Sequence, residues 1–104
     1  MGVPTMAMFV LLNKFTDQGA KNIQSLRTTV EANMARGEHL GIKIHGWYLT
    51  QGQYDIVVIV EAPDAETMLA NAAGVAGTGN VRTETLRAFT LDEADQVIKR
   101  VSGA

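Results

Sequence analysis

Gly46-Trp-Tyr-Leu-Thr-Gln-Gly-Gln-Tyr-Asp-Ile-Val-Val-Ile-Val60 is the stretch that decides the fold. Two runs rich in β-branched and aromatic residues flank a short turn at Gln51-Gly52-Gln53, a pattern typical of a β-hairpin. The second run is apolar at almost every position, which indicates a strand buried on both faces. The hairpin therefore predicts a layered fold with a central strand in this segment.

The other expected elements lie on both sides of this hairpin. Met6 to Leu12 is a short apolar run, and Pro4 before it suits a strand start because proline has no amide to donate. Thr90 and Glu93 form a capping-box pattern at the start of a terminal helix. In chain order we expect a strand at 6–12, a helix from Thr16 or Asp17 to Gly37 or Gly41, strands at 42–50 and 54–61, a helix capped by Asp64, a strand at 80–89 and a helix at 91–101.

Helical spacing predicts which residues of the two long helices face inward. Apolar residues three or four positions apart form one stripe of a helix. In the first helix these are Ile23, Leu26, Val30 and Met34, and in the second Met68, Leu69, Ala72, Ala73 and Val75.

The order strand-helix-strand-strand-helix-strand, with right-handed crossovers, predicts an α+β ferredoxin-like sheet with strand order 4-1-3-2. Both long helices then cover one face, although Val57 and Ile59 point to the other. If such side chains stayed exposed to water, the fold would lose roughly 1.5–3 kcal/mol of burial free energy for each of them. We therefore expect a second copy on the open face, giving a homodimer, or a higher oligomer, in which two sheets close an α/β barrel. The terminal helix could clasp this partner or cover a sheet edge.

Composition limits the class of protein. The 104 residues are expected to form one domain, with a core at about 6–89 and a terminal helix at about 91–101. A net charge of -2 argues against a nucleic-acid partner, and strand 54–61 lacks the stacking aromatics of an RNA-binding sheet. No apolar run approaches a membrane span, and there is no cysteine. These features predict a cytoplasmic protein.

Candidate catalytic residues are His45 and Asp55. If the hairpin turn holds three residues, both share the open face with Val57 and Ile59, and Trp47 forms an aromatic wall beside them. The alternative is that Asp55 bonds local amides and His45 is solvated near a sheet edge.

Candidate ligand-binding residues are hydroxyl and aromatic side chains on the strands. They are Trp47, Tyr48, Tyr54, Thr83 and Thr85. Alternatively, the tyrosines are packing residues whose hydroxyl groups are exposed to solvent, and the threonines only favour strand formation. The two histidines lie six residues apart with no flanking carboxylate pattern, so no metal site and no cofactor are predicted. A haem ligand at His45 is a further alternative.

Gly52-Gln-Tyr-Asp55, followed by Glu61-Ala-Pro-Asp64, resembles the GYD domain family. Gly79-Asn-Val-Arg-Thr-Glu-Thr-Leu-Arg-Ala-Phe89 and Phe15-Thr-Asp-Gln-Gly19 are similar to other parts of that family, whereas Leu40-Gly41 departs from an expected Gly-Gly pair. The resemblance implies a single GYD-like domain and a dimeric α+β barrel. It implies no reaction, because the family is largely uncharacterised. The matching positions are Gly52, Tyr54, Asp55, Pro63, Asp64, Asn80, Thr83 and Thr85.

Two functions follow as hypotheses. The first is an oligomeric module that binds a small molecule or a partner protein. The alternative is a cofactor-free enzyme, a monooxygenase or isomerase that acts on a small apolar compound in the dimer cavity. That alternative rests on fold-level analogy, and the sequence leaves open whether the protein is an enzyme.

Overall fold

The structure is a computed structural model that describes residues 6–103. Its four strands form one antiparallel sheet of order β2-β3-β1-β4. The strands are β1 (Ala7–Phe15), β2 (Lys43–Leu49), β3 (Ile56–Ala62) and β4 (Val81–Ala88). The helices are α1 (Asp17–Lys21), the 3-10 turn η1 (Ile23–Ser25), α2 (Leu26–His39), α3 (Ala65–Ala76) and α4 (Leu91–Val101). The predicted ferredoxin-like α+β fold and strand order are confirmed, while Pro4 lies outside the described residues.

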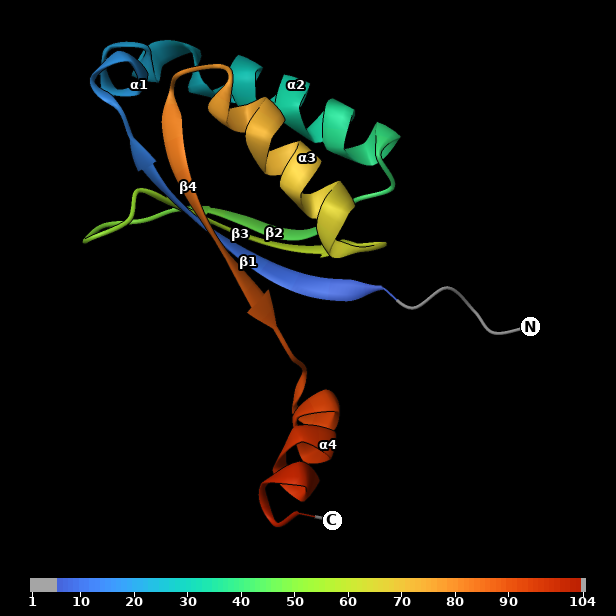
Figure 1. Ribbon diagram of the computed structural model, residues 1–104. Coiled ribbons are helices and arrows are strands. Elements are labelled where there is room, and N and C mark those ends of the chain that lie inside the picture. The colour runs from blue at the N-terminus through green and yellow to red at the C-terminus, as the bar shows by residue number, and fades with distance from the viewer. Residues whose placement is uncertain (1–5, 104) are drawn as a thin grey trace.

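Two layers make up the body of the molecule. Figure 1 shows α2 and α3 side by side on one face of the sheet, while α4 extends away from the end of β4. The core lies between the helices and the central strands β1 and β3. Its buried side chains include Phe9, Leu11, Val58, Val60 and Met68.

The first helical segment is broken into three pieces where one continuous helix was expected. Thr16 is the N-cap, as predicted, and its hydroxyl accepts a 3.1 Å hydrogen bond from the amide of Gly19. The break falls at Asn22 and Ser25, where the Ser25 hydroxyl donates to the Asn22 carbonyl. Such side-chain bonds to the backbone compete with the helical hydrogen bonds. The segment ends at Gly41, whose φ of +83° is left-handed, whereas Gly37 lies buried inside α2.

The inward stripe of α3 differs from the predicted one at two positions, because Leu69 and Ala73 are both exposed. Asp64 caps the helix, as predicted, by accepting a 2.7 Å hydrogen bond from the amide of Thr67. Met68 is buried, but Leu69 is 71% exposed, so its predicted inward position is wrong. Asn71 is buried in its place.

The hairpin at residues 46–60 has a longer turn than predicted, and its first strand is irregular. The amide of Thr50 donates to the carbonyl of Asp55, so four residues connect the two arms instead of three. A β-bulge between Ile44 and Gly46 then shifts the register, because one residue of β2 is left without a partner. The four-residue turn already places Trp47 opposite the buried Val58, where it packs against the core, and the bulge puts His45 out of step with Trp47. The expectation that Trp47 shares the open face is therefore wrong.

Candidate functional site

An uncovered apolar surface spans all four strands on the face opposite α2 and α3. Two rows of residues paired in register carry it: Tyr48, Val57 and Leu12 in one row, and Ile59, Val10 and Leu86 in the other. Met8 extends this surface along β1. We call these seven residues the open face. No other described element of the chain lies over them (Figure 1).

Charged side chains of both signs border the open face. Lys14 and Arg82 are paired across β1 and β4 at one end. At the other end, Nε2 of His45 lies 2.5 Å from Oε1 of Glu61. The border therefore offers both cations and anions to whatever lies against the face.

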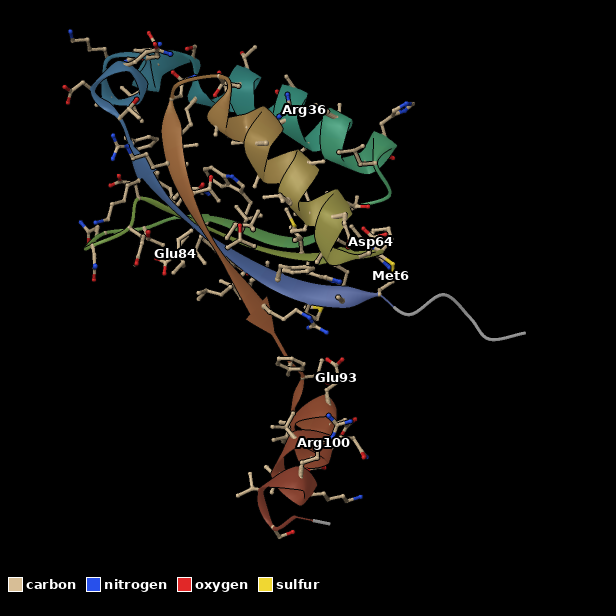
Figure 2. All side chains as sticks on the ribbon, viewed as in Figure 1. Met6, Arg36, Asp64, Glu84, Glu93 and Arg100 are labelled. Carbon is tan, nitrogen blue, oxygen red and sulfur yellow. The ribbon has the colours of Figure 1, made fainter. Side chains whose placement is uncertain are left out.

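The terminal helix α4 is amphipathic and packs against no layer of the fold. Its capping box is complete, as predicted: the Thr90 amide donates 2.9 Å to the Glu93 carboxylate, and the Glu93 amide donates 3.1 Å to the Thr90 hydroxyl. None of its residues is buried. Figure 2 shows its side chains, with Glu93 and Arg100 labelled, on a helix that stands apart from the sheet. Its exposed apolar residues are Leu91, Val97, Ile98 and Val101.

Within one protomer the two candidate catalytic residues lie at opposite ends of the sheet. His45 contacts Glu61, near the end of β3. Asp55 precedes the start of β3, and its Oδ2 accepts a 2.8 Å hydrogen bond from the amide of Phe15. Glu61 and Asp55 are six strand residues apart, which is about 20 Å. Asp55 thus ties the hairpin to β1, and the chain does not bring it to His45.

The two tyrosines also lie apart from one another. Tyr48 is exposed on the open face, with its ring over Gly46. The Tyr54 hydroxyl donates a 2.6 Å hydrogen bond to the Glu84 carboxylate. This bond, more than any other contact, raises the pKa of Tyr54. Tyr54 therefore links the end of the hairpin to β4.

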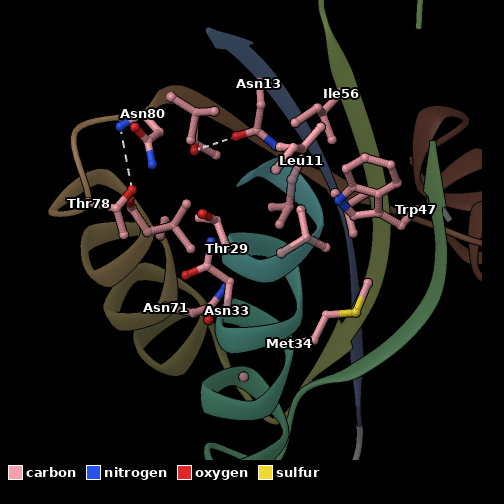
Figure 3. Close-up of a pocket in the computed structure, with 18 of the residues that line it drawn as sticks. Leu11, Asn13, Thr29, Asn33, Met34, Trp47, Ile56, Asn71, Thr78 and Asn80 are labelled. Carbon is pink, nitrogen blue, oxygen red and sulfur yellow. Dashed lines mark hydrogen bonds between the residues drawn. The ribbon is translucent and has the colours of Figure 1, made fainter. Parts of the chain in front are cut away.

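An internal cavity of about 90 Å³ lies between the helices and the sheet (Figure 3). Trp47 and Thr83 line it, so two of the predicted ligand-binding residues meet here, on the helix side of the sheet. Thr85 lies two residues further along β4 and is exposed. Asn71 also lines the cavity, and its buried Oδ1 has no hydrogen-bond partner among the residues that the structure describes. The sequence analysis did not predict that Asn71 lines this cavity.

A sequence model of the GYD domain family matches residues 9–98. The chain belongs to the GYD domain family. A relative from Thermus thermophilus, named "Glutamine synthetase and cystathionine beta-lyase binding protein", is 33% identical over 85 residues. The alignment covers 81% of this chain and 90% of the relative.

In this GYD protein, several motif residues have structural roles. Gly52 adopts a φ of +118° in the hairpin turn, a conformation that residues with a Cβ rarely adopt. Asp64 caps α3. Asn80 accepts hydrogen bonds from the side-chain amides of Gln18 and Asn22, which fastens the first helical segment to the start of β4. These contacts hold the fold together.

Among residues 6–103, no three His, Cys, Asp or Glu side chains are placed to hold a metal ion. Over the same residues, no helix is long and apolar enough to span a membrane.

Proposed function

We propose that this GYD protein is a homodimeric protein-interaction module of the cytoplasm. The observation that carries the proposal is the pair of uncovered apolar surfaces, the open face and the stripe of α4. Neither surface is covered by another part of residues 6–103. A cysteine-free composition agrees with a reducing compartment.

The open face is assigned to a second copy of the chain. Side chains such as Val10 and Ile59 are only half-buried, although they occupy the centre of the sheet. A two-fold interface uses the same patch twice, so the patch must be complementary to itself. Lys14 and Arg82 at one end and Glu61 at the other supply both signs of charge for such an interface.

The stripe of α4 is assigned to a partner protein. An amphipathic helix that stands free of its own fold suits docking into an apolar groove of another protein. Leu91, Ile98 and Val101 are 79%, 59% and 83% exposed and are spaced for one face of the helix. Binding to glutamine synthetase or cystathionine beta-lyase is proposed here from the name of the relative.

An enzyme acting in the dimer cavity was the alternative hypothesis. The separation of His45 from Asp55 within the protomer removes the acid–base pair on which this hypothesis was based, so the geometry favours the interaction module. Its remaining support is analogy of fold.

Binding of the immobilised full chain to purified glutamine synthetase and cystathionine beta-lyase from the same organism tests the proposal. We expect at least one to bind at micromolar concentration, and the double variant Ile98→Ser, Val101→Ser to weaken this binding at least tenfold. The matched control is Asp95→Ser, Lys99→Ser on the same helix, which should bind like the wild type. All variants should remain dimeric. Absence of binding by both enzymes contradicts the protein-binding role, and a monomeric α4 variant would instead make α4 the clasp between copies.

A further inference from the structure

The connection between β4 and α4 is short. β4 ends at Ala88 and α4 begins at Leu91. Two residues, Phe89 and Thr90, connect them. None of the residues of α4 is buried, and Figure 1 shows the helix apart from both layers of the fold. The direction in which α4 leaves the sheet therefore depends on the backbone angles of these two connecting residues.

Thr90 is held from the side of the helix. Its backbone is extended, with φ of −63° and ψ of 166°. The capping box uses both its amide and its hydroxyl, which bond the carboxylate and the amide of Glu93. Thr90 therefore moves together with the first turn of α4, and Phe89 is the residue at which the helix could change direction.

Arg87 holds Phe89 to the end of the sheet. Its Nη1 donates hydrogen bonds to the carbonyl of Met8, at 3.2 Å, and to the carbonyl of Ala88. Its guanidinium carbon lies 4.3 Å from the ring centroid of Phe89 and 5.6 Å from that of Phe9. A planar guanidinium can stack on aromatic rings and donate hydrogen bonds at the same time. Arg87 thus contacts β1 and the connecting segment at once.

The charge of Arg87 also acts on the first turn of α4. The hydrogen bond from the Thr90 amide has the largest effect in lowering the pKa of Glu93, and the positive charge of Arg87 lowers it further. Both favour the charged form of Glu93, which is the form that best accepts the Thr90 amide in the capping box. Arg87 is therefore connected to α4 through Phe89 and through Glu93.

We propose that Arg87 is a positioning residue, which fixes the direction of α4 relative to the sheet by joining β1 to Phe89. Its importance for binding rests on the function proposed above for α4. A helix that is already held in one orientation loses less conformational freedom when a partner binds it. Arg87 thereby strengthens the binding of a partner protein to the stripe of α4.

Residual dipolar couplings of the backbone amides test this role in the free protein, because they report the orientation of α4 and its averaging by motion. In the wild type, the couplings of α4 should fit the same alignment tensor as those of the sheet. In Arg87→Ala, we expect the couplings of α4 to fall below about half of their wild-type size, with those of the sheet unchanged. Arg87→Lys keeps the charge but lacks the planar group, and it should behave like Arg87→Ala.

Two further variants show whether the effect passes through the ring of Phe89. Phe89→Leu should loosen α4 as Arg87→Ala does, and the double variant should loosen it no further, because both changes remove one contact. Arg27→Ala is the matched control, since it removes an exposed arginine from α2. Its couplings should equal those of the wild type. The Cα chemical shifts of residues 92–100 should stay helical in every variant.

Binding to whichever of glutamine synthetase and cystathionine beta-lyase the wild type recognises should weaken at least about threefold in Arg87→Ala and stay unchanged in Arg27→Ala. Failure of the wild type to bind either enzyme would contradict the proposed function alone, because the couplings are measured without a partner. Any of four results would overturn the role of Arg87: wild-type couplings of α4 that do not fit the tensor of the sheet; couplings unchanged in Arg87→Ala; loss of the helix itself in that variant; or equal affinity of that variant and the wild type.

Discussion

Thr83 lies opposite Asn13 in the pairing of β1 with β4, and its hydroxyl donates a 2.6 Å hydrogen bond to Asn13 Oδ1. Asn13 is 6% exposed, so loss of this donor leaves a buried acceptor unsatisfied. We expect Thr83→Val to lower the free energy of unfolding by about 1–3 kcal/mol, measured by urea denaturation.

Thr85 provides the control for that variant. It lies on the same strand two residues away, opposite Leu11, and is exposed. Thr85→Val should change the free energy of unfolding by no more than about 0.5 kcal/mol. Equal effects of the two substitutions would show that the Thr83–Asn13 hydrogen bond contributes little.

Met68 and Leu69 are neighbours in α3 with opposite environments, 1% and 71% exposed. Met68→Ala should lower the free energy of unfolding by about 2–5 kcal/mol, because it leaves a cavity in the core. Leu69→Ala removes a similar volume from the surface and should change it by less than about 0.5 kcal/mol. Thermal or urea unfolding of both variants checks this, and a larger loss for Leu69→Ala would contradict the position of the α3 stripe.

The capping box of α4 should make this helix sensitive to acid. The Thr90 amide, which donates to the Glu93 carboxylate, holds the pKa of Glu93 below its usual range. The folded state therefore releases this proton more readily than the unfolded chain. The stabilisation is complete above the pKa of an unfolded glutamate, about 4.3, and is lost as the pH falls through the lower folded value.

A carbon-detected NMR titration of Glu93 measures this effect. We expect its midpoint to lie below that of an unfolded glutamate, with the Thr90 amide resonance following the same curve. In Glu93→Gln the Thr90 amide should no longer follow a curve with that midpoint. A Glu93 midpoint at or above the unfolded value would show that the box does not favour the charged carboxylate.

Local sequence patterns were sufficient to predict most of the elements. The helix caps at Thr16, Asp64 and Thr90 could be predicted from the sequence, because each side-chain oxygen accepts a hydrogen bond from an amide only three residues ahead. The strand order followed from the order of elements and the handedness of crossovers. These features depend on a few neighbouring residues or on general rules of chain connection.

The faces of β2 were not predictable in the same way. Strict alternation after a three-residue turn placed Trp47 with His45 on the open face, but the four-residue turn sets Trp47 opposite Val58, and the bulge between Ile44 and Gly46 puts His45 out of step with it. Whether a strand bulges depends on how its side chains pack against the neighbouring layer, which alternation does not encode. The candidate site on the open face changed for this reason.

Asn71 was not predicted to line the cavity, because apolar residues are the ones expected inside a protein. Met68, Asn71, Ala72 and Val75 have regular helical spacing, and this was the available signal. The predicted stripe contained only apolar residues, Leu69 among them, and burial of an unpaired amide such as that of Asn71 is unfavourable. Only the three-dimensional arrangement shows that Asn71 is buried beside an internal cavity.

The molecular mass in solution, measured by sedimentation equilibrium across the micromolar range, tests the assignment of the open face most directly. We predict a folded species of twice the chain mass of 11.2 kDa. Ile59→Asp on the open face should reduce the mass to that of one chain with the strand signal in circular dichroism retained, whereas Leu69→Asp on the helix layer should leave the dimer intact. A folded wild-type protein of 11.2 kDa at every concentration would contradict the assignment.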